Sequence, residues 1–201
     1  MKEKDQFLIS NLFNEVATKY DLLNDLLSLG LHRLWKRRLL MLLKPVSGEN
    51  WIDICCGTGD LAISLAGYVS PGGSVLGIDS ASGPLALARK RAIKKSIEVS
   101  WFQTDALNTG LEGNKFDGAV MGYGLRNLED PGAGLLELRR LLRQDARAGV
   151  LDFNRLPDGS LAERFQKLYL RKVVVPIASQ FGLRDHYAYL EKSLKVFPDG
   201  K

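Results

Sequence analysis

The stretch Trp51-Ile-Asp-Ile-Cys-Cys-Gly-Thr-Gly-Asp-Leu-Ala62 decides the fold. Its apolar start predicts a short buried strand, and the pattern after Gly59 predicts a helix. A strand, a glycine turn and a helix N-terminus together form the geometry that grips a nucleotide-like ligand. Gly57 and Gly59 let the backbone approach that ligand in conformations that a Cβ resists. The carboxylate of Asp53 repels pyrophosphate, but it can receive the ammonium group of an amino-acid-like cofactor.

Two further acids follow apolar runs later in the chain. Asp79 ends the run 74–79, where an acid can take both ribose hydroxyls of an adenosine ligand. Asp105 ends the run 99–105, where it can face an adenine edge. Residues 57–62 also fit G-x-G-x-x-A, so a nicotinamide cofactor stays open as the alternative. Acids after three successive strands resemble the arrangement in the seven-stranded S-adenosylmethionine (AdoMet) methyltransferases. The cofactor-binding residues that we predict are Asp53, Gly57, Thr58, Gly59, Asp79, Asp105, Ala106 and Gly122.

The composition is that of a globular protein. Its 201 residues are enough for one domain with a sizeable core and appendages, and 45% are hydrophobic and 25% charged. No apolar run approaches the ~20 residues needed to cross a bilayer. Cys55 and Cys56 are the only cysteines, so they build neither a disulfide framework nor a four-ligand zinc site. We interpret them as small apolar fillers in a reducing compartment, and we expect no metal.

Short apolar runs alternate with helical patterns from residue 49 to 154. We expect strands at 50–54, 74–79, 98–104, 116–122 and 147–153, and helices at 59–68, 83–95 and 131–143. This alternation predicts an α/β fold, a Rossmann-like parallel sheet with helices on both faces. Ligands of such sheets lie at the carboxyl ends of the strands, where the three acids stand.

The flanking segments predict helices. Residues 5–44 contain no strand pattern, and Val173-Val-Val-Pro176 favours a helix over a strand. We therefore predict an N-terminal helical substrate cap at 1–48, an AdoMet-binding core at 49–154 and a helical substrate lid at 155–201.

One predicted helix, 31–43, carries an apolar and a basic face. Leu31, Leu34, Trp35, Leu39 and Leu42 fall on one side, with Arg33, Lys36 and Arg37 opposite and Leu40 among them. Two interpretations stay open: a helix packed on the core with a solvated basic face, or an interfacial helix that rests on anionic lipid. The net charge of +5 and a pI of about 9.2 suit an anionic surface, and no RNA-binding signature accompanies them.

Residues 121–128, Met-Gly-Tyr-Gly-Leu-Arg-Asn-Leu, follow the fourth predicted strand. Two glycines bracket Tyr123, which again indicates a close backbone approach. Arg126 and Asn127 then lie in a loop at the ligand end of the sheet. There an arginine can hold an oxyanion and the asparagine amide can donate to a second oxygen. The alternative is a surface arginine beside a turn.

At this point the chain resembles the ubiquinone/menaquinone biosynthesis C-methyltransferase family. The likeness rests on Phe13-Asn-Glu-Val-Ala17 with Tyr20-Asp21, on Leu27-Ser-Leu-Gly-Leu-His-Arg-Leu-Trp-Lys36, and on Gly124-Leu-Arg-Asn127. Variants such as Asp53-Ile-Cys-Cys-Gly57 are closest to its plant and cyanobacterial branch. That branch methylates reduced demethylphylloquinone, a 2-phytyl-1,4-naphthoquinone, in vitamin K1 biosynthesis. The resemblance implies AdoMet as cofactor and a lipophilic prenylated quinol as substrate.

The implied chemistry assigns roles to four residues. A ring carbon becomes nucleophilic when the adjacent hydroxyl loses its proton, so we expect only the reduced quinol to react. Arg126, with Asn127 beside it, is the candidate to stabilise the phenolate, directly or through water. Tyr20 orients the hydroxyl or packs, and His32 accepts the proton or caps the basic helix. Alternatives are a demethylmenaquinone or ubiquinone-precursor methyltransferase, or an AdoMet-binding partner without activity.

The resemblance also sets expectations about extent and location. Members of the family continue past Lys201 with a helix and two strands, so we expect strands 6 and 7 of the sheet to be missing. Residues 1–6 resemble neither a signal nor a transit peptide, so any targeting segment lies outside this sequence. We expect a place at the thylakoid surface in a chloroplast, or at the membrane periphery in a bacterium. Peripheral membrane contact fits the substrate, nucleic acid does not, and a homodimer stays open.

Overall fold

A computed structural model describes Asp25, Ser28 and residues 30–153, and beyond them 159–161, 164, 168–174 and 176. The described chain divides into two compact units. One contains Arg33–Asp152, and the other contains the described residues of 21–32 and 153–201. The predicted signature at residues 13–21, including Tyr20, lies outside the described residues. No helix among the described residues is long and apolar enough to cross a membrane.

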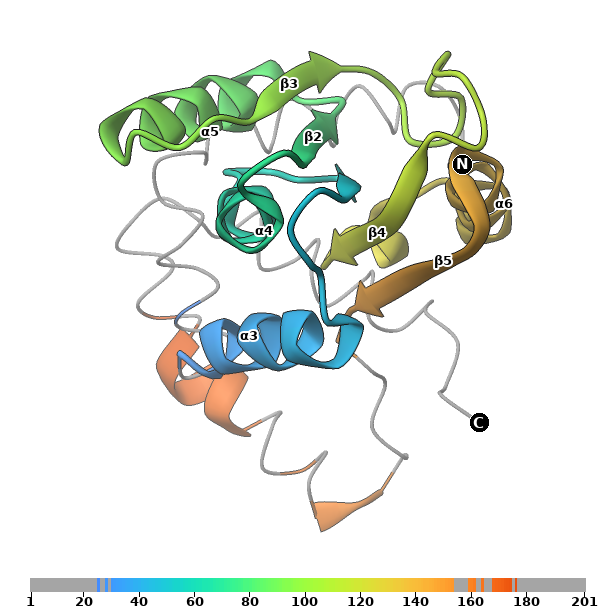
Figure 1. Cartoon of the computed structure of the whole chain (residues 1–201). Helices are drawn as coiled ribbons and strands as arrows, with labels where there is room; N and C mark the ends of the chain where they lie inside the picture. The colour runs from blue at the N-terminus through green and yellow to red at the C-terminus, as the bar shows by residue number, and fades with distance from the viewer. Residues whose placement is uncertain are drawn as a thin grey trace. The chain divides into compact units, whose positions relative to one another are not determined.

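The first unit is built on a five-stranded parallel sheet, with strand order β3-β2-β1-β4-β5 (Figure 1). The strands are β1 (Asn50–Ile54), β2 (Ser74–Asp79), β3 (Ser100–Gln103), β4 (Phe116–Gly122) and β5 (Leu142–Leu151). The helices are α3 (Leu31–Leu43), α4 (Asp60–Val69), α5 (Ser82–Lys94) and α6 (Pro131–Leu141), with a short 3-10 turn η1 (Leu125–Asn127). The α/β Rossmann-like fold predicted from the alternating pattern is therefore confirmed.

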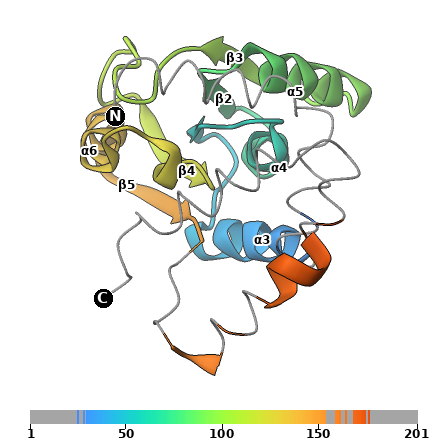
Figure 2. The ribbon, with the colours of Figure 1, turned by 180° about the vertical axis from the view of Figure 1, so that it is seen from behind.

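Helices cover both faces of this sheet because the buried side chains of β1 alternate between them. Trp51 packs with Leu40 and Leu43 of α3 and with Leu65 of α4. Ile52 and Ile54 face the other way. They pack in a second cluster that contains Leu138 and Leu141 of α6. Figure 2, the view from behind, shows α6 on the opposite side of the sheet from α4. The central strand is thus buried on both faces, which explains its apolar sequence.

Most predicted bounds agree with the structure within one or two residues, but β5 does not. It begins at Leu142 instead of 147, directly after α6. Its pairing with β4 is irregular between Phe116 and Gly118, and Asp145 adopts a left-handed φ of 64°. In a bulge the side chains no longer alternate regularly between the two faces of the sheet. The stretch Arg143-Gln-Asp-Ala-Arg147 therefore lacks the alternation of apolar and polar residues that predicts a strand.

Of the two interpretations left open for α3, the one in which its larger apolar face packs on the core is wrong. Leu34 is 58% exposed and Leu42 63% exposed, whereas Leu40 is 2% exposed. Lys36, expected in solvent, has a side chain that is only 15% exposed. The face of α3 that packs on the core contains Lys36, Leu40 and Leu43, and the larger apolar face lies at the surface.

The second unit contains His32 and a π-helical turn, η2 (Leu170–Val174). The helix favoured over a strand at 173–176 is confirmed for the described part of that run. His32 is 1% exposed, and its Nε2 lies 2.8 Å from Asp25 Oδ1. Its backbone N–H donates to Ser28 Oγ at 3.1 Å. The imidazole is therefore held by a carboxylate of its own unit.

Candidate functional site

Two cavities lie at the carboxyl ends of β1, β2 and β4, where the strand order reverses. The larger, about 770 Å³ with its open mouth, is lined by Asp79, Asp105, Ala106 and Asn127 among others. The smaller, about 320 Å³, is lined among others by Lys36, Asp53, Thr58, Asp60 and Gly122. Cys55, Gly57 and Tyr123 line both. The two cavities therefore adjoin one another at these three residues.

Asp79 faces the larger cavity from the end of β2. Its Oδ2 accepts from Gly57 N at 2.8 Å and its Oδ1 accepts from Ala81 N at 2.9 Å. Burial raises the pKa of Asp79 above its ordinary value of 3.8, and these backbone donors oppose the rise. The Ser80 backbone also donates to this carboxylate, and since two carboxylate oxygens offer about four acceptor sites, the backbone orients it without using all of them. It can accept two hydroxyl groups, as predicted for a ribose.

Asp105 and Ala106 lie on the far wall of the same cavity. Asp105 Oδ1 accepts from Leu107 N at 2.9 Å, a turn that fixes the carboxylate beyond β3. Ala106 is 7% exposed and belongs to the core cluster under β1. Asp79, Asp105 and Ala106 therefore line one cavity, and their contacts with a cofactor stay predictions.

Asp53 lies in the smaller cavity and is 1% exposed. Its Oδ2 accepts from Ala62 N at 2.9 Å, at the start of α4. Its Oδ1 is buried and has no hydrogen-bond partner in the described part of the chain. Burial raises the pKa of Asp53 from 3.8 to about 8, and the Ala62 N–H and the Lys36 charge work against this rise. A buried polar atom without a partner is costly, so a donor that reached Asp53 Oδ1 would stabilise this site.

The turn between β1 and α4 is strained where it borders the two cavities. Gly59 has φ +83°, and a Cβ there would lie 2.5 Å from Trp101 Cη2. Cys55 adopts a left-handed φ of 57°, although it has a side chain. Thr58 is 3% exposed and accepts a hydrogen bond from Arg91 Nη1 at 3.0 Å. Gly59 is therefore required by packing and backbone geometry, whereas Gly57 and Thr58 line the site.

The two cysteines sit under this turn as free thiols. Burial raises the pKa of both thiols well above 9.0, and the neighbouring carboxylates add to the rise. They are therefore neutral and small, in agreement with the filler role predicted for them. Cys55 is also a wall of both cavities, which the sequence did not indicate.

Tyr123 stands at the junction of the two cavities. It is 2% exposed and has a left-handed φ of 61°. The Lys36 ammonium lies 5.8 Å from its ring centroid, and the Arg126 guanidinium carbon 5.9 Å. Gly122 and Gly124 flank it; a Cβ on Gly124 would lie 2.5 Å from Cys55 Cβ. The two glycines thus allow Tyr123 to approach the cofactor turn.

Arg126 and Asn127 are held by the ends of the strands. Arg126 Nη1 forms an ion pair with Asp152, and the two side chains are 7% and 6% exposed. It also donates to Tyr123 O at 3.1 Å, as does Asn127 Nδ2 at 3.1 Å. Asn127 lines the larger cavity, whereas Arg126 is not among the residues that line either cavity. The proposed contact of Arg126 with a phenolate stays a prediction, as do the roles of Tyr20 and His32.

Solved structures with this architecture identify the class of fold. A SAM-dependent methyltransferase from Aquifex aeolicus matches with a TM-score of 0.57 and 20% identity, over 68% of this chain and 77% of that one. The [4+2]-cyclase SpnF matches with a TM-score of 0.58 and 23% identity, over 65% and 48%. The fold is therefore that of the AdoMet-dependent methyltransferases, and it does not by itself define the reaction.

The sequence decides the family. The ubiE/COQ5 methyltransferase family matches residues 1–201, so the chain belongs to this family of AdoMet-dependent methyltransferases. A protein of Nostoc punctiforme named "2-phytyl-1,4-naphtoquinone methyltransferase" is 44% identical over 195 residues, 96% of this chain and 84% of that protein. An Arabidopsis thaliana protein named "2-phytyl-1,4-beta-naphthoquinone methyltransferase, chloroplastic" is 38% identical, over 94% and 74%. Family membership decides against the nicotinamide alternative.

Proposed function

We propose that this chain methylates a ring carbon of a reduced 2-phytyl-1,4-naphthoquinone, with AdoMet as methyl donor, in phylloquinone biosynthesis. The observation that carries the proposal is the pair of adjoining cavities, one lined by Asp79 and Asp105 and the other by Asp53. It is supported by the relatives that share this family and are named for that substrate.

The donor set fits AdoMet along its whole length. The larger cavity offers Asp79 to ribose hydroxyls and Asp105 to the adenine edge. The smaller cavity offers the buried Oδ1 of Asp53 to an ammonium group. When bound, AdoMet supplies a methyl group on a positively charged sulfur. Tyr123 and Cys55 bound the middle of the site, so they exclude water from the segment between adenosine and amino acid.

The acceptor carbon requires an electron-rich ring. A reduced quinol has the hydroxyl whose deprotonation makes the ring carbon nucleophilic, and an oxidised quinone does not. Asn127 lines the larger cavity and its Nδ2 donates to Tyr123 O, so its amide is oriented by the loop. We propose that the Asn127 amide donates a hydrogen bond to a quinol oxygen. Arg126, which is paired with Asp152, contributes positive charge to the same loop.

Labelled AdoMet tests this function directly. We expect methyl transfer to reduced demethylphylloquinol and none to the oxidised quinone. Equal rates with a demethylmenaquinol would broaden the substrate class, and a preference for a demethoxy-benzoquinol would replace it by a ubiquinone precursor. Cofactor binding without transfer to any quinol would refute the assignment and leave a partner without activity.

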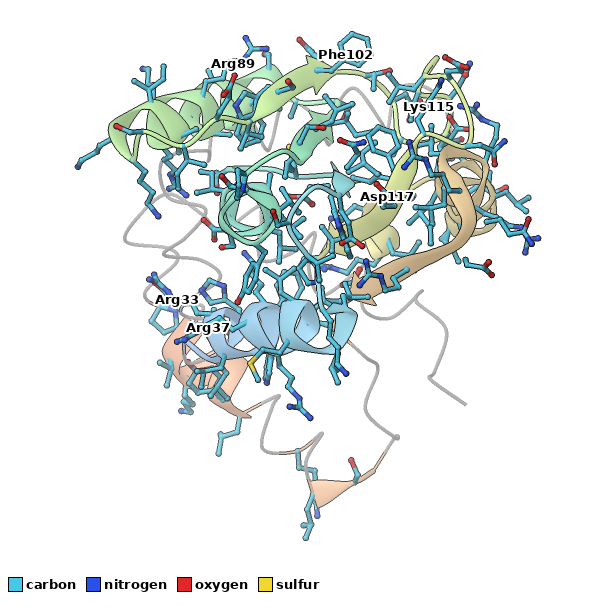
Figure 3. The ribbon with its side chains drawn as sticks, in the orientation of Figure 1. Arg33, Arg37, Arg89, Phe102, Lys115 and Asp117 are labelled. Carbon is cyan, nitrogen blue, oxygen red and sulfur yellow. The ribbon has the colours of Figure 1, made fainter. Side chains whose placement is uncertain are left out.

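The exposed face of α3 supports a lipid surface as the source of this substrate. Its apolar residues include Leu34, Met41 and Leu42, each more than half exposed. Arg33 and Arg37 lie along the same helix (Figure 3), where they can pair with anionic headgroups. We therefore place the protein at the membrane periphery, in a chloroplast or in a bacterial cell.

Vesicle sedimentation tests this membrane contact. Leu34→Glu and Leu42→Glu should each reduce binding to anionic vesicles several-fold, because they place a charge in the interface. Ile93, 77% exposed on α5, provides the matched control Ile93→Glu, which should bind like the parent. Equal binding by all three variants would remove α3 from the contact.

A further inference from the structure

Lys36 connects helix α3 to the cofactor turn. Its Nζ lies 3.0 Å from Asp60 Oδ2, at the first residue of α4. The same ammonium lies 5.8 Å from the Tyr123 ring centroid. The side chain is 15% exposed and lines the smaller cavity together with Asp53. A cation and a buried carboxylate therefore face one cavity at the end where we place the amino-acid part of AdoMet.

Lys36 and Asp53 place a positive and a negative charge on this cavity, the charges complementary to the carboxylate and the ammonium of an α-amino acid. Asp60 is a second anion in its lining. A free amino acid carries an ammonium and a carboxylate on one carbon, so it needs an anion and a cation close together. Asp53 Oδ1 provides the anion, and it has no partner among the described residues. Lys36 is the cation that lines this cavity. The Lys36 charge also opposes the rise in the pKa of Asp53 that burial causes.

We propose that Lys36 binds the carboxylate of the amino-acid end of the cofactor, in exchange for its contact with Asp60. The inference rests on the proposed function, because it takes AdoMet as the ligand. Asp60 keeps a cationic partner after the exchange, since Arg91 Nη1 lies 3.3 Å from Asp60 Oδ1. The exchange therefore leaves no carboxylate of the turn without a cation.

Because Lys36 lies on α3, its contact with the cofactor carboxylate links this helix to the bound cofactor. Leu40 and Leu43, one and two turns further along α3, are buried in the core cluster with Trp51. Lys36 thus projects from a helix that the core holds in place, which reduces the entropy lost when it binds an anion. The cofactor carboxylate then stabilises the same helix whose opposite face we assign to lipid.

Three ligands separate this role from a merely structural one. S-adenosylhomocysteine carries both the ammonium and the carboxylate, decarboxylated AdoMet carries only the ammonium, and methylthioadenosine carries neither. By calorimetry, Lys36→Met should weaken S-adenosylhomocysteine by about 10- to 100-fold, the loss of one charge-assisted contact. It should change the affinity for the other two ligands by less than about twofold. Lys36→Arg should retain most of the affinity.

Two further variants keep the test decisive if Lys36→Met folds poorly. Asp60→Asn should bind S-adenosylhomocysteine as well as the parent or better, because Lys36 loses its competing anion. Arg38→Met removes a charge from an exposed position of the same helix to which we assign no contact, and it should bind all three ligands like the parent. Circular dichroism confirms that each variant is folded.

Each outcome has one reading. An equal loss for all three ligands in Lys36→Met, or a loss for S-adenosylhomocysteine in Asp60→Asn, would show that the Lys36–Asp60 pair only holds α3 to the turn and would overturn the inference. If the parent protein binds all three ligands but transfers no methyl group, the proposed substrate fails and the Lys36 contact stands. If the parent binds none of them, both fail.

Discussion

Asp53→Asn should stabilise the protein at neutral pH in the absence of cofactor. Burial raises the pKa of Asp53 to about 8, and the charges of Asp79 and Asp60 add to the rise. Between the ordinary value of 3.8 and about 8, the folded state therefore binds more protons at this site than the unfolded state. Stability then falls as the pH rises through this window, by about 1.4 kcal/mol per pH unit.

The magnitude follows from the same two pKa values. At pH 7 the side chain is mostly neutral when folded and ionised when unfolded, which costs on the order of 4 kcal/mol. Asparagine has the same shape and no charge, and its Oδ1 can accept from the Ala62 N–H that now donates to Asp53. The stability gained by Asp53→Asn should therefore be near zero at pH 4, rise through neutral pH and level off above about pH 8.

Urea unfolding from pH 5 to 9 measures this difference, and the other titrating groups cancel between the two proteins. A difference that does not change with pH would refute the reasoning, because it would mean that Asp53 titrates alike in both states. Cofactor binding gives a second readout. A bound ammonium requires ionised Asp53, so S-adenosylhomocysteine should release close to one proton at pH 7 in calorimetry with two buffers. Methylthioadenosine should release none.

Four further predictions concern the frame of the site and the helix that follows its turn. Gly59→Ala should destabilise the protein by about 3 kcal/mol, because its Cβ meets Trp101 at a left-handed φ. Gly67→Ala, at an exposed position of α4 where a Cβ contacts nothing, should stabilise it by about 1 kcal/mol in the same urea experiment. Gly124→Ala should weaken the binding of S-adenosylhomocysteine about tenfold, because the new Cβ clashes with Cys55 Cβ. Adding Cys55→Gly should restore most of the affinity, and no recovery in the double variant would contradict this contact. Asp152→Ala should cost about 3–5 kcal/mol, because it leaves a buried guanidinium without its carboxylate, and a loss below 1 kcal/mol by urea unfolding would show that water replaces it.

The strands and the positions of the acids that follow them were predictable because their signals are local. A short apolar run followed by an acid and glycines specifies both a buried parallel strand and the chemistry at its end. Asp53, Asp79 and Asp105 were placed correctly for that reason, at one edge of the sheet. The start of β5 was not predictable, since a bulge removes the alternation on which the prediction depends.

The faces of α3 were misjudged for a physical reason. The larger apolar stripe of a helix usually faces the core, and that rule assumes that nothing else competes for it. Here Leu40 and Leu43 fill the core, and the stem of Lys36 runs beside them to reach Asp60. Lys36 was therefore counted among solvated charges, and its place in the cavity depends on a tertiary contact that no local pattern records.

The signature Gly124-Leu-Arg-Asn127 acquires a different meaning in the structure. Its arginine was expected to meet the substrate, yet it is buried against Asp152 at the end of β5. Arg126 and Asn127 both donate to the carbonyl of Tyr123, whose N–H donates to Leu151 O. These contacts hold Tyr123 in a left-handed conformation between the two cavities. The signature thus holds the residue that separates the two cavities, so a change at Arg126 should first displace Tyr123, and its direct contact with a quinol stays a prediction.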